Sequence, residues 1–182
     1  MEVRPRRILD VGSNTGHFSA LAAQLDGAEV VGIDSDAVAA GRAWRMARDR
    51  GLNILPLVVD LARPTPAVGW KNRECASFLD RAAGEFDCVL MLAVLHHMLV
   101  AERVPLEEIL DLAAQLTRDL AVIEFVAPQD PMFRELTRGR DHLHEGLSVQ
   151  SFEQACGRWF RVCRQERLPE LARWMFVLRR LS

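Results

Sequence analysis

The chain has 182 residues, of which 49% are hydrophobic and 26% charged, and its formal net charge is −2. Because a domain usually takes about 100 to 200 residues, residues 1–182 are predicted to form a single domain. This composition is typical of a folded globular protein and excludes a disordered, fibrous or coiled-coil chain. A near-neutral charge creates no field that attracts a polyanion, so nucleic-acid binding is not expected without a local basic patch.

The apolar stretches of the chain are too short for a membrane protein. The longest purely apolar run, residues 88–95, is well below the roughly 20 residues that span a bilayer. The first residues run into a strand-like segment without the apolar core of a signal peptide. No membrane association is expected, and the cytoplasm is the predicted location. The four cysteines form no C-x-x-C pair, and free thiols are predicted, with Cys88 buried.

Apolar runs of strand length alternate along the chain with segments of helical period, which predicts an α/β protein with a mostly parallel sheet. The first predicted helix has Phe18, Leu21, Ala22 and Leu25 on its inner face. The inner face of the second consists of Ala40, Ala43, Trp44 and Ala47, and Gly51 ends it. Further helices are predicted near residues 74–83, 106–113 and 148–158. Strands are predicted at residues 7–11, 28–34, 54–60, 86–92, 120–126, 159–167 and 172–179, the last two antiparallel because their turn is short.

Two segments carry no predicted element. Residues 61–73 contain three proline or glycine residues and are predicted to be irregular, while residues 128–146 are polar. Trp70 in the first segment suits stacking on a planar substrate, or it anchors the loop. In the second, Asp141, His142, His144 and Glu145 are metal-ligand types, but the run is short and lacks separated partners, so no metal site is predicted. This second segment is instead assigned to a lid or substrate wall, together with Glu124 and Asp130.

The sequence DVGSNTGHF, residues 10–18, lies where the first strand ends and the first helix begins. Gly12 and Gly16 permit a left-handed backbone and close approach of a ligand, and Asn14 readily accepts the same conformation. Amides at the start of the helix are expected to point outward toward a carboxylate or another polar group. A dinucleotide loop would have glycine at positions 14 and 17, where this chain has Asn14 and His17. The loop therefore suits a smaller ligand that carries both an amine and a carboxylate.

With an acidic residue at Asp10 followed by Gly12, Asn14 and Gly16, the sequence resembles the class I S-adenosylmethionine-dependent methyltransferases. Asp34 and Asp60 end the next two strands in the order that this family shows. The resemblance implies a Rossmann-like three-layer sandwich with a seven-stranded sheet in the order 3-2-1-4-5-7-6 and an antiparallel end. It also implies that S-adenosylmethionine is the cofactor and S-adenosylhomocysteine its product. The implied cofactor-binding residues are Asp10, Gly12, Ser13, Asn14, Thr15, Gly16, Asp34, Ser35, Asp60, Leu61, Leu92 and Ala93.

Each of these positions has a structural alternative. The loop can be a plain strand-to-helix turn, Asp34 can cap the next helix, and Asp60 can serve a turn. His96 and His97 follow the fourth strand, at the edge of the sheet where open α/β folds bind ligands. His97 is the candidate catalytic base or substrate contact, with a packed histidine as its alternative, and His96 is expected to be buried.

These features predict transfer of a methyl group to an oxygen or nitrogen of a small molecule. One alternative is a methyltransferase acting on RNA or protein, with Arg134, Arg138 and Arg140 as a basic rim; the other is a non-catalytic module that binds the cofactor. The chain also resembles a bacterial group of methyltransferases related to nodulation proteins. Few residues precede the first strand, so a second subunit or a flanking domain is a candidate to cover the active site, beside the two irregular segments.

Overall fold

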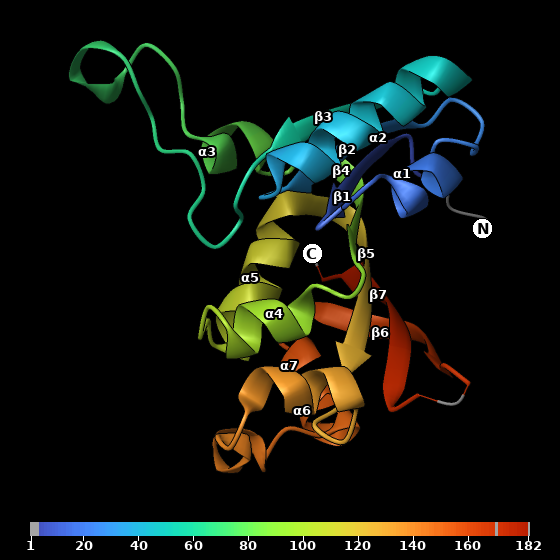
Figure 1. Ribbon diagram of the computed structural model, residues 1–182, viewed down its shortest axis with the longest axis vertical. Helices are drawn as coiled ribbons and strands as arrows, with labels where there is room; N and C mark the ends of the chain where they lie inside the picture. The colour runs from blue at the N-terminus through green and yellow to red at the C-terminus, as the bar shows by residue number, and fades with distance from the viewer. Residues whose placement is uncertain (1–3, 170, 182) are drawn as a thin grey trace. The chain divides into compact units, whose positions relative to one another are not determined.

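A computed structural model describes residues 4–169 and 171–181. In this part of the chain the strands form a seven-stranded sheet in the order β3-β2-β1-β4-β5-β7-β6, which confirms the predicted order and the α/β fold class (Figure 1). The strands are β1 (Arg7–Val11), β2 (Glu29–Asp34), β3 (Ile54–Val58), β4 (Phe86–Met91), β5 (Thr117–Val126), β6 (Phe160–Arg167) and β7 (Arg173–Arg180).

The residues group into two compact units, which are described one at a time. The first extends to Leu90 and includes Gln115–Asp119; the second comprises Met91–Ala114 and the chain from Leu120 onward. The helices are α1 (His17–Ala22), α2 (Ala37–Arg50), α3 (Phe78–Ala82), α4 (Leu95–Val100), α5 (Leu106–Leu116), α6 (Pro131–Thr137) and α7 (Val149–Cys156), with 3-10 turns η1 (Trp70–Asn72) and η2 (Asp141–His144).

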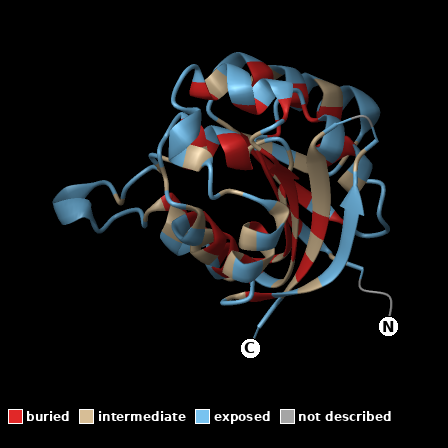
Figure 2. Cartoon of the chain, turned by 90° about the horizontal axis from the view of Figure 1, so that it is seen from below, coloured by how far each residue is buried: buried red, intermediate tan, exposed pale blue. Residues whose placement is uncertain are grey.

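In the first unit, β1, β2 and β3 run parallel. Ile8 pairs with Val30, and Val30 with Ile54, so the carboxyl ends of the three strands lie at one edge. β1 is buried from Ile8 to Val11, as expected for a strand covered on both faces of a parallel sheet. Figure 2 shows buried residues gathered on the central strands of the sheet, while strands at the edge are largely exposed. This arrangement places the loops that follow β1, β2 and β3 at a common edge.

The predicted inner face of the first helix is wrong. Phe18, Leu21 and Leu25 are exposed, whereas Ser19 and Ala20 are buried, and α1 ends at Ala22 before Leu25 is reached. Ser19 faces inward because its hydroxyl donates a hydrogen bond to the buried carboxylate of Asp10, at 2.6 Å. A buried carboxylate without a donor is costly, so this contact sets which face of the short helix turns inward.

The second helix buries only small residues. Ala39, Ala40, Ala43 and Ala47 are buried, while Trp44, predicted to lie on the inner face, is 53% exposed. The close approach of α2 to the glycine loop explains this, since a Cβ built on Gly16 would lie 3.2 Å from the Cβ of Ala43. The indole stacks instead on the guanidinium of Arg48, 4.9 Å from its ring centre.

The segment between β3 and α3 forms a long loop, and η1 lies at the tip of this loop (Figure 1). Val68 and Cys75 pair there as an isolated antiparallel bridge. Trp70 is 74% exposed, so it does not anchor the loop, which was one of its two predicted roles. The predicted helix near residues 74–83 is present but short, because it begins only after the Ser77 side chain caps it by accepting from the Asp80 amide.

In the second unit, β7 pairs antiparallel with β6, as the short turn between them predicts, and it also pairs antiparallel with β5. The core on one face of these strands is aromatic: Phe152 of α7 packs on Phe125 and Phe176, with ring centres 4.9 and 4.8 Å apart. α7 begins with a capping box formed by Ser148 and Ser151. The register shifts between Val162 and Arg164, a bulge that the sequence did not reveal.

Two helices of the second unit were not predicted. α6 lies in the polar stretch 128–146, where Asp130 caps the helix by accepting from the Met132 amide and Pro131 occupies its first turn. An aspartate followed by proline is a recognisable start signal, and it was missed. α4 begins right after β4 and carries His96 and His97, so these histidines lie on a helix.

Candidate functional site

The loop between β1 and α1 is held against β2 by its own backbone. The amides of Gly12 and Ser13 both donate to the carbonyl of Ile33, at 2.9 and 3.0 Å. Gly12, Asn14 and Gly16 all adopt a left-handed backbone, with φ of 69°, 49° and 87°, so Asn14 occupies the conformation predicted for it. The sequence pattern therefore folds into the tight strand-to-helix turn that its residue types favour.

Asp34, at the end of β2, is joined to this loop. Its Oδ2 accepts from the Asn14 amide at 2.8 Å, and its Oδ1 accepts from the Asp36 amide at the same distance. Asp34 does not cap the next helix, because Asp36 does so by accepting from the Val38 amide. Ser35, between the two aspartates, is exposed. An ionised carboxylate has about four acceptor positions, so Asp34 retains capacity for two further donors.

Asp10 lies beneath the loop, almost fully buried. Burial raises its pKa to about 6, although the hydrogen bond from Ser19 acts in the opposite direction, and the nearby charge of Asp34 adds to the increase. Asp10 is therefore largely ionised at pH 7 and partly protonated at mildly acidic pH. Asp10 thus lies at the end of β1 as a buried acid that is held by the Ser19 hydroxyl.

Two polar groups of the loop remain without a partner. The buried hydroxyl of Ser13 has none, and within residues 4–169 and 171–181 the Thr15 amide finds no acceptor. The amide of Gly16, in contrast, donates to the Ser13 carbonyl and is not open, unlike the sequence-based expectation for the start of the helix. An unpaired polar group in a folded chain is costly unless water or a ligand satisfies it. The loop thus fits a small polar ligand, with Thr15 as its free donor.

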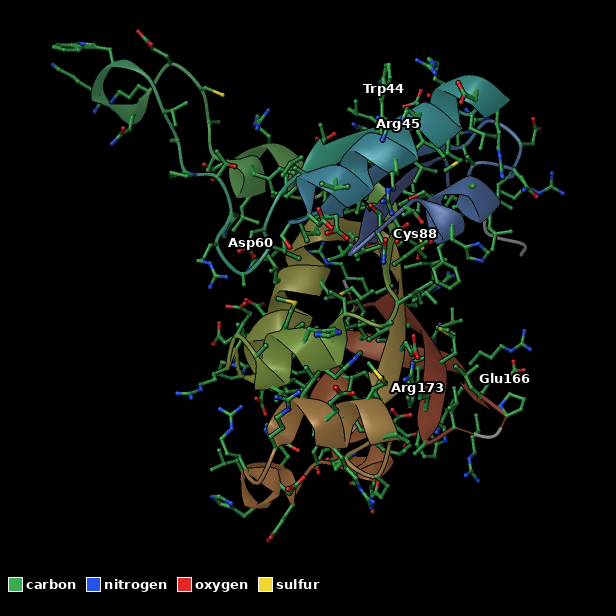
Figure 3. The ribbon with its side chains drawn as sticks, viewed as in Figure 1. Trp44, Arg45, Asp60, Cys88, Glu166 and Arg173 are labelled. Carbon is green, nitrogen blue, oxygen red and sulfur yellow. The ribbon has the colours of Figure 1, made fainter. Side chains whose placement is uncertain are left out.

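Asp60 and Leu61 follow β3 beside this loop system. The Val59 amide donates to the Asp34 carbonyl at 2.9 Å, which places Asp60 one residue away from that bond. The Asp60 carboxylate accepts from the Ala62 amide and forms an ion pair with Arg63, each at 3.0 Å. Asp60 therefore performs the predicted turn role, and as a half-exposed carboxylate it keeps acceptor positions for a ligand (Figure 3). Leu61 is buried.

The remaining predicted residues belong to the second unit. Leu92 and Ala93 connect β4 to α4, and Ala93 has a left-handed backbone with φ of 54°. His97 lies on the exposed side of α4, and partial desolvation lowers its pKa, so its imidazole is neutral at pH 7. His96 is buried, as expected, with its Nδ1 unpaired; burial and the neighbouring His97 lower its pKa to about 4.

A buried charge network in the second unit escaped the sequence analysis. Arg173 of β7 donates its Nε to Asp130 at 2.9 Å and its Nη1 to Glu124 at 3.1 Å (Figure 3). Burial alone would raise the pKa of Asp130, but the bonds from Arg173 and the Met132 amide lower it. The sequence predicts a lid or substrate wall for Glu124 and Asp130. Their partner Arg173 lies 43 residues beyond Asp130, so no local sequence pattern could identify it. The network fastens the start of α6 to β5 and β7.

Metal and membrane features are absent from the described part of the chain. Among its residues, no group of three or more histidine, cysteine, aspartate or glutamate side chains could hold a metal ion, and the four cysteines are free. No helix in residues 4–169 or 171–181 is both long and apolar enough to cross a bilayer.

The family of the chain follows from this fold and from sequence comparison. A family described as a methyltransferase domain matches residues 2–174, and the chain belongs to it. Together with the strand order, this places the chain in the class I S-adenosylmethionine-dependent methyltransferase family. Membership in the family implies S-adenosylmethionine as the cofactor.

Relatives agree with this assignment. The chain is 32% identical over 177 residues to the nodulation protein NoeA of Rhizobium meliloti (strain 1021), which confirms the resemblance to nodulation proteins. The match covers 97% of this chain and 37% of that protein, so the chain spans little more than a third of this relative.

Solved structures share the fold. One is the magnesium protoporphyrin IX methyltransferase of Synechocystis PCC 6803 with bound SAH, with a TM-score of 0.64 and 21% identity over 96% of this chain and 73% of that one. Another is an S-adenosylmethionine-dependent methyltransferase of Aquifex aeolicus, with a TM-score of 0.64 and 15% identity over 97% and 82% of the two chains.

Proposed function

We propose that the protein transfers a methyl group from S-adenosylmethionine to an oxygen or nitrogen atom of a small molecule, and that residues 1–182 act as one domain. The observation that carries the proposal is the 2.8 Å hydrogen bond from the Asn14 amide to Asp34. It ties the glycine loop to an acidic side chain at the neighbouring strand end, in a chain of the methyltransferase family. A single ligand could then contact the loop with its amino acid part and Asp34 with its ribose, because this hydrogen bond holds the two elements side by side.

The proposed roles follow from the donors and acceptors of the first unit. Asp34 would accept the ribose hydroxyls with its free lone pairs, and the Thr15 amide would meet the carboxylate of the methionine part. Asp60 would accept from the adenine amine, and the backbone amide of Leu61 would meet the ring. The other cofactor contacts proposed for the loop are Asp10, Gly12, Ser13, Asn14, Gly16 and Ser35.

Leu92, Ala93 and His97 are proposed from the family resemblance, each for its own role. Leu92 and Ala93 would lie near the sulfonium, and the neutral imidazole of His97 would accept the proton that the acceptor loses. The bound cofactor supplies an activated methyl group. The chain then needs mainly to hold the reacting atoms in line, which can contribute on the order of 7 to 11 kcal/mol.

The small-molecule acceptor is favoured over RNA by charge. A net charge of −2 provides no general attraction for a polyanion, and phosphate binding would show itself as a steep dependence of affinity on salt. A protein that binds the cofactor but methylates nothing would correspond to the non-catalytic alternative.

The test has two stages. Isothermal titration of the folded protein with S-adenosylhomocysteine measures cofactor binding; no heat and no thermal shift at millimolar ligand would refute the proposed site. Incubation with methyl-labelled cofactor and a panel of small hydroxyl and amine compounds, with total RNA and casein as comparison arms, then measures transfer. Label in a small molecule supports the proposal, whereas label confined to RNA or protein contradicts it.

A further inference from the structure

One cavity lies wholly within the second unit, and none of its lining residues belongs to the proposed cofactor site. Its volume is about 310 Å³, at the lower end of the range for small-ligand sites. The walls come from α4, the loop that follows it, and η2. Leu99, Val104 and Leu143 give the cavity apolar sides, while Arg103, Arg140 and His144 provide its polar groups.

Arg140 is oriented by a helix end. Its Nε donates to the carbonyl of Thr137 at 3.2 Å, in the last turn of α6, which fixes the plane of the guanidinium. The Nη1 group makes no hydrogen bond within residues 4–169 and 171–181 and is free to donate. Asp141, the neighbouring acid, does not line the cavity; it accepts from the Thr137 hydroxyl at 2.7 Å.

Arg103 is the second cation of the wall, and it has no partner among the described residues. Its side chain forms no ion pair or hydrogen bond there, although Glu102 is its neighbour in sequence. Its backbone is left-handed, with φ of 57°, which costs roughly 1 to 2 kcal/mol in a residue other than glycine. This backbone cost arises at a position where the Arg103 side chain lines an apolar cavity.

His144 adds no positive charge to the cavity at neutral pH. Burial and the charge of Arg140 lower its pKa, and the nearby Asp141 only partly compensates. Its imidazole also meets the edge of Phe133, with ring centres 5.3 Å apart. The cavity at pH 7 therefore combines three apolar side chains with two arginine cations and one neutral ring.

We propose that this cavity binds a small organic anion, with an apolar body among Leu99, Val104 and Leu143 and a carboxylate held by Arg103 and Arg140. Guanidinium groups pair with carboxylates through charge-assisted hydrogen bonds. None of these residues is among those proposed for the cofactor or for catalysis. The inference holds or fails independently of the methyltransferase proposal.

The test uses octanoate as the probe and isothermal titration of the whole chain as the measurement. The expected dissociation constant is on the order of 1 mM, given the affinity that a ligand of this size usually reaches. Acetate, which lacks the apolar body, and octylamine, which carries the opposite charge, are each expected to bind at least about tenfold more weakly.

Variants then assign the charges. Arg103→Gln and Arg140→Gln are each expected to weaken octanoate binding about tenfold. Arg42→Gln, an exposed arginine of α2 in the first unit, is the control and leaves it unchanged. Arg103 is exposed in a loop, so its variant tests the proposal even if Arg140→Gln disturbs α6. Absence of saturable octanoate binding, equal binding of octylamine, or unchanged affinity in Arg103→Gln would overturn the proposal.

Discussion

The carboxylate of Asp34 accepts the backbone amide of Asn14 across 2.8 Å, although 20 residues separate them in the chain. The bond connects a left-handed turn to the end of the neighbouring strand. It also uses only part of the hydrogen-bonding capacity of Asp34, so one side chain both braces the loop and remains able to bind. A substitution at Asp34 should therefore weaken ligand binding without unfolding the loop only if the new side chain still offers an acceptor oxygen to the Asn14 amide.

Asp34→Asn keeps one side-chain oxygen as an acceptor and removes the charge. We expect cofactor affinity to fall about tenfold, because charge-assisted bonds are roughly twice as strong as neutral ones. The unfolding free energy should fall by about 1 to 3 kcal/mol, because the amide group of asparagine replaces the acceptor of one of the two backbone amides, Asn14 or Asp36, by a second donor. Titration calorimetry with S-adenosylhomocysteine and chemical denaturation measure the two effects. Asp49→Asn, an exposed carboxylate on α2, is the control. An affinity equal to that of the wild type would remove Asp34 from the site.

Gly16→Ala should destabilise the loop more than the same change at another left-handed glycine. A Cβ at Gly16 would lie 2.7 Å from the terminal methyl of Met46 and 3.2 Å from Ala43, whereas one at Gly27 meets nothing within 4 Å. Both carry the backbone cost of about 1 kcal/mol, and Gly16→Ala adds a packing cost of roughly 1 to 3 kcal/mol. Urea unfolding of the two variants gives the difference. Equal losses of stability would show that α2 moves away from residue 16 and relieves the close contact with Met46 and Ala43.

Asp10→Asn should change how stability depends on pH. Burial raises the pKa of Asp10 to about 6 in the folded chain, above the ordinary value of 3.8 for an aspartate, so the folded state binds the proton more tightly. The wild type should therefore lose stability as pH rises from about 3 to about 7, by roughly 3 kcal/mol relative to Asp10→Asn. Chemical denaturation of both proteins across this range measures the difference. Parallel pH profiles would contradict the raised pKa.

Arg173→Met tests the buried network of the second unit. Asp130 has no exposed side-chain surface and that of Arg173 is 16% exposed, so removing the arginine leaves carboxylates buried without their partner. A loss of about 3 to 5 kcal/mol in unfolding free energy is expected. Arg164→Met breaks the ion pair with Glu166, whose side chains are 72% and 60% exposed, and should cost under about 1 kcal/mol. Similar losses in the two variants would refute the difference between these pairs.

His97→Gln tests the proposed base. If His97 takes the acceptor's proton, the turnover rate should fall by about 10² to 10⁴ while cofactor affinity stays unchanged. Because its pKa lies below the usual value for histidine, wild-type activity should persist through neutral pH and decline only in acid, as the imidazole becomes protonated. A pH profile of initial rates with the identified acceptor measures this. Full activity in the variant would show that His97 is not the base, and that α4 contributes only to the orientation of the reacting groups.

Several elements of this protein were determined by local sequence. The alternation of apolar runs with helical segments indicated the strands and helices, because a buried parallel strand and an amphipathic helix leave different periods in a sequence. The order of the strands in the sheet came from the resemblance to the methyltransferase family. Gly12, Asn14 and Gly16 likewise indicated a turn at the right place, since few residue types accept a left-handed backbone.

Other features were decided only in three dimensions. Ser19 faces inward in place of Phe18 because a buried carboxylate nine residues earlier requires a donor, and Trp44 faces outward because α2 approaches Gly16 too closely for an indole. Arg173 joins Asp130 and Glu124 across more than 40 residues. Hydrophobic periodicity reports how each segment meets water on average, whereas buried charges and close backbone contacts are satisfied by partners distant in sequence, which only the folded chain brings within reach.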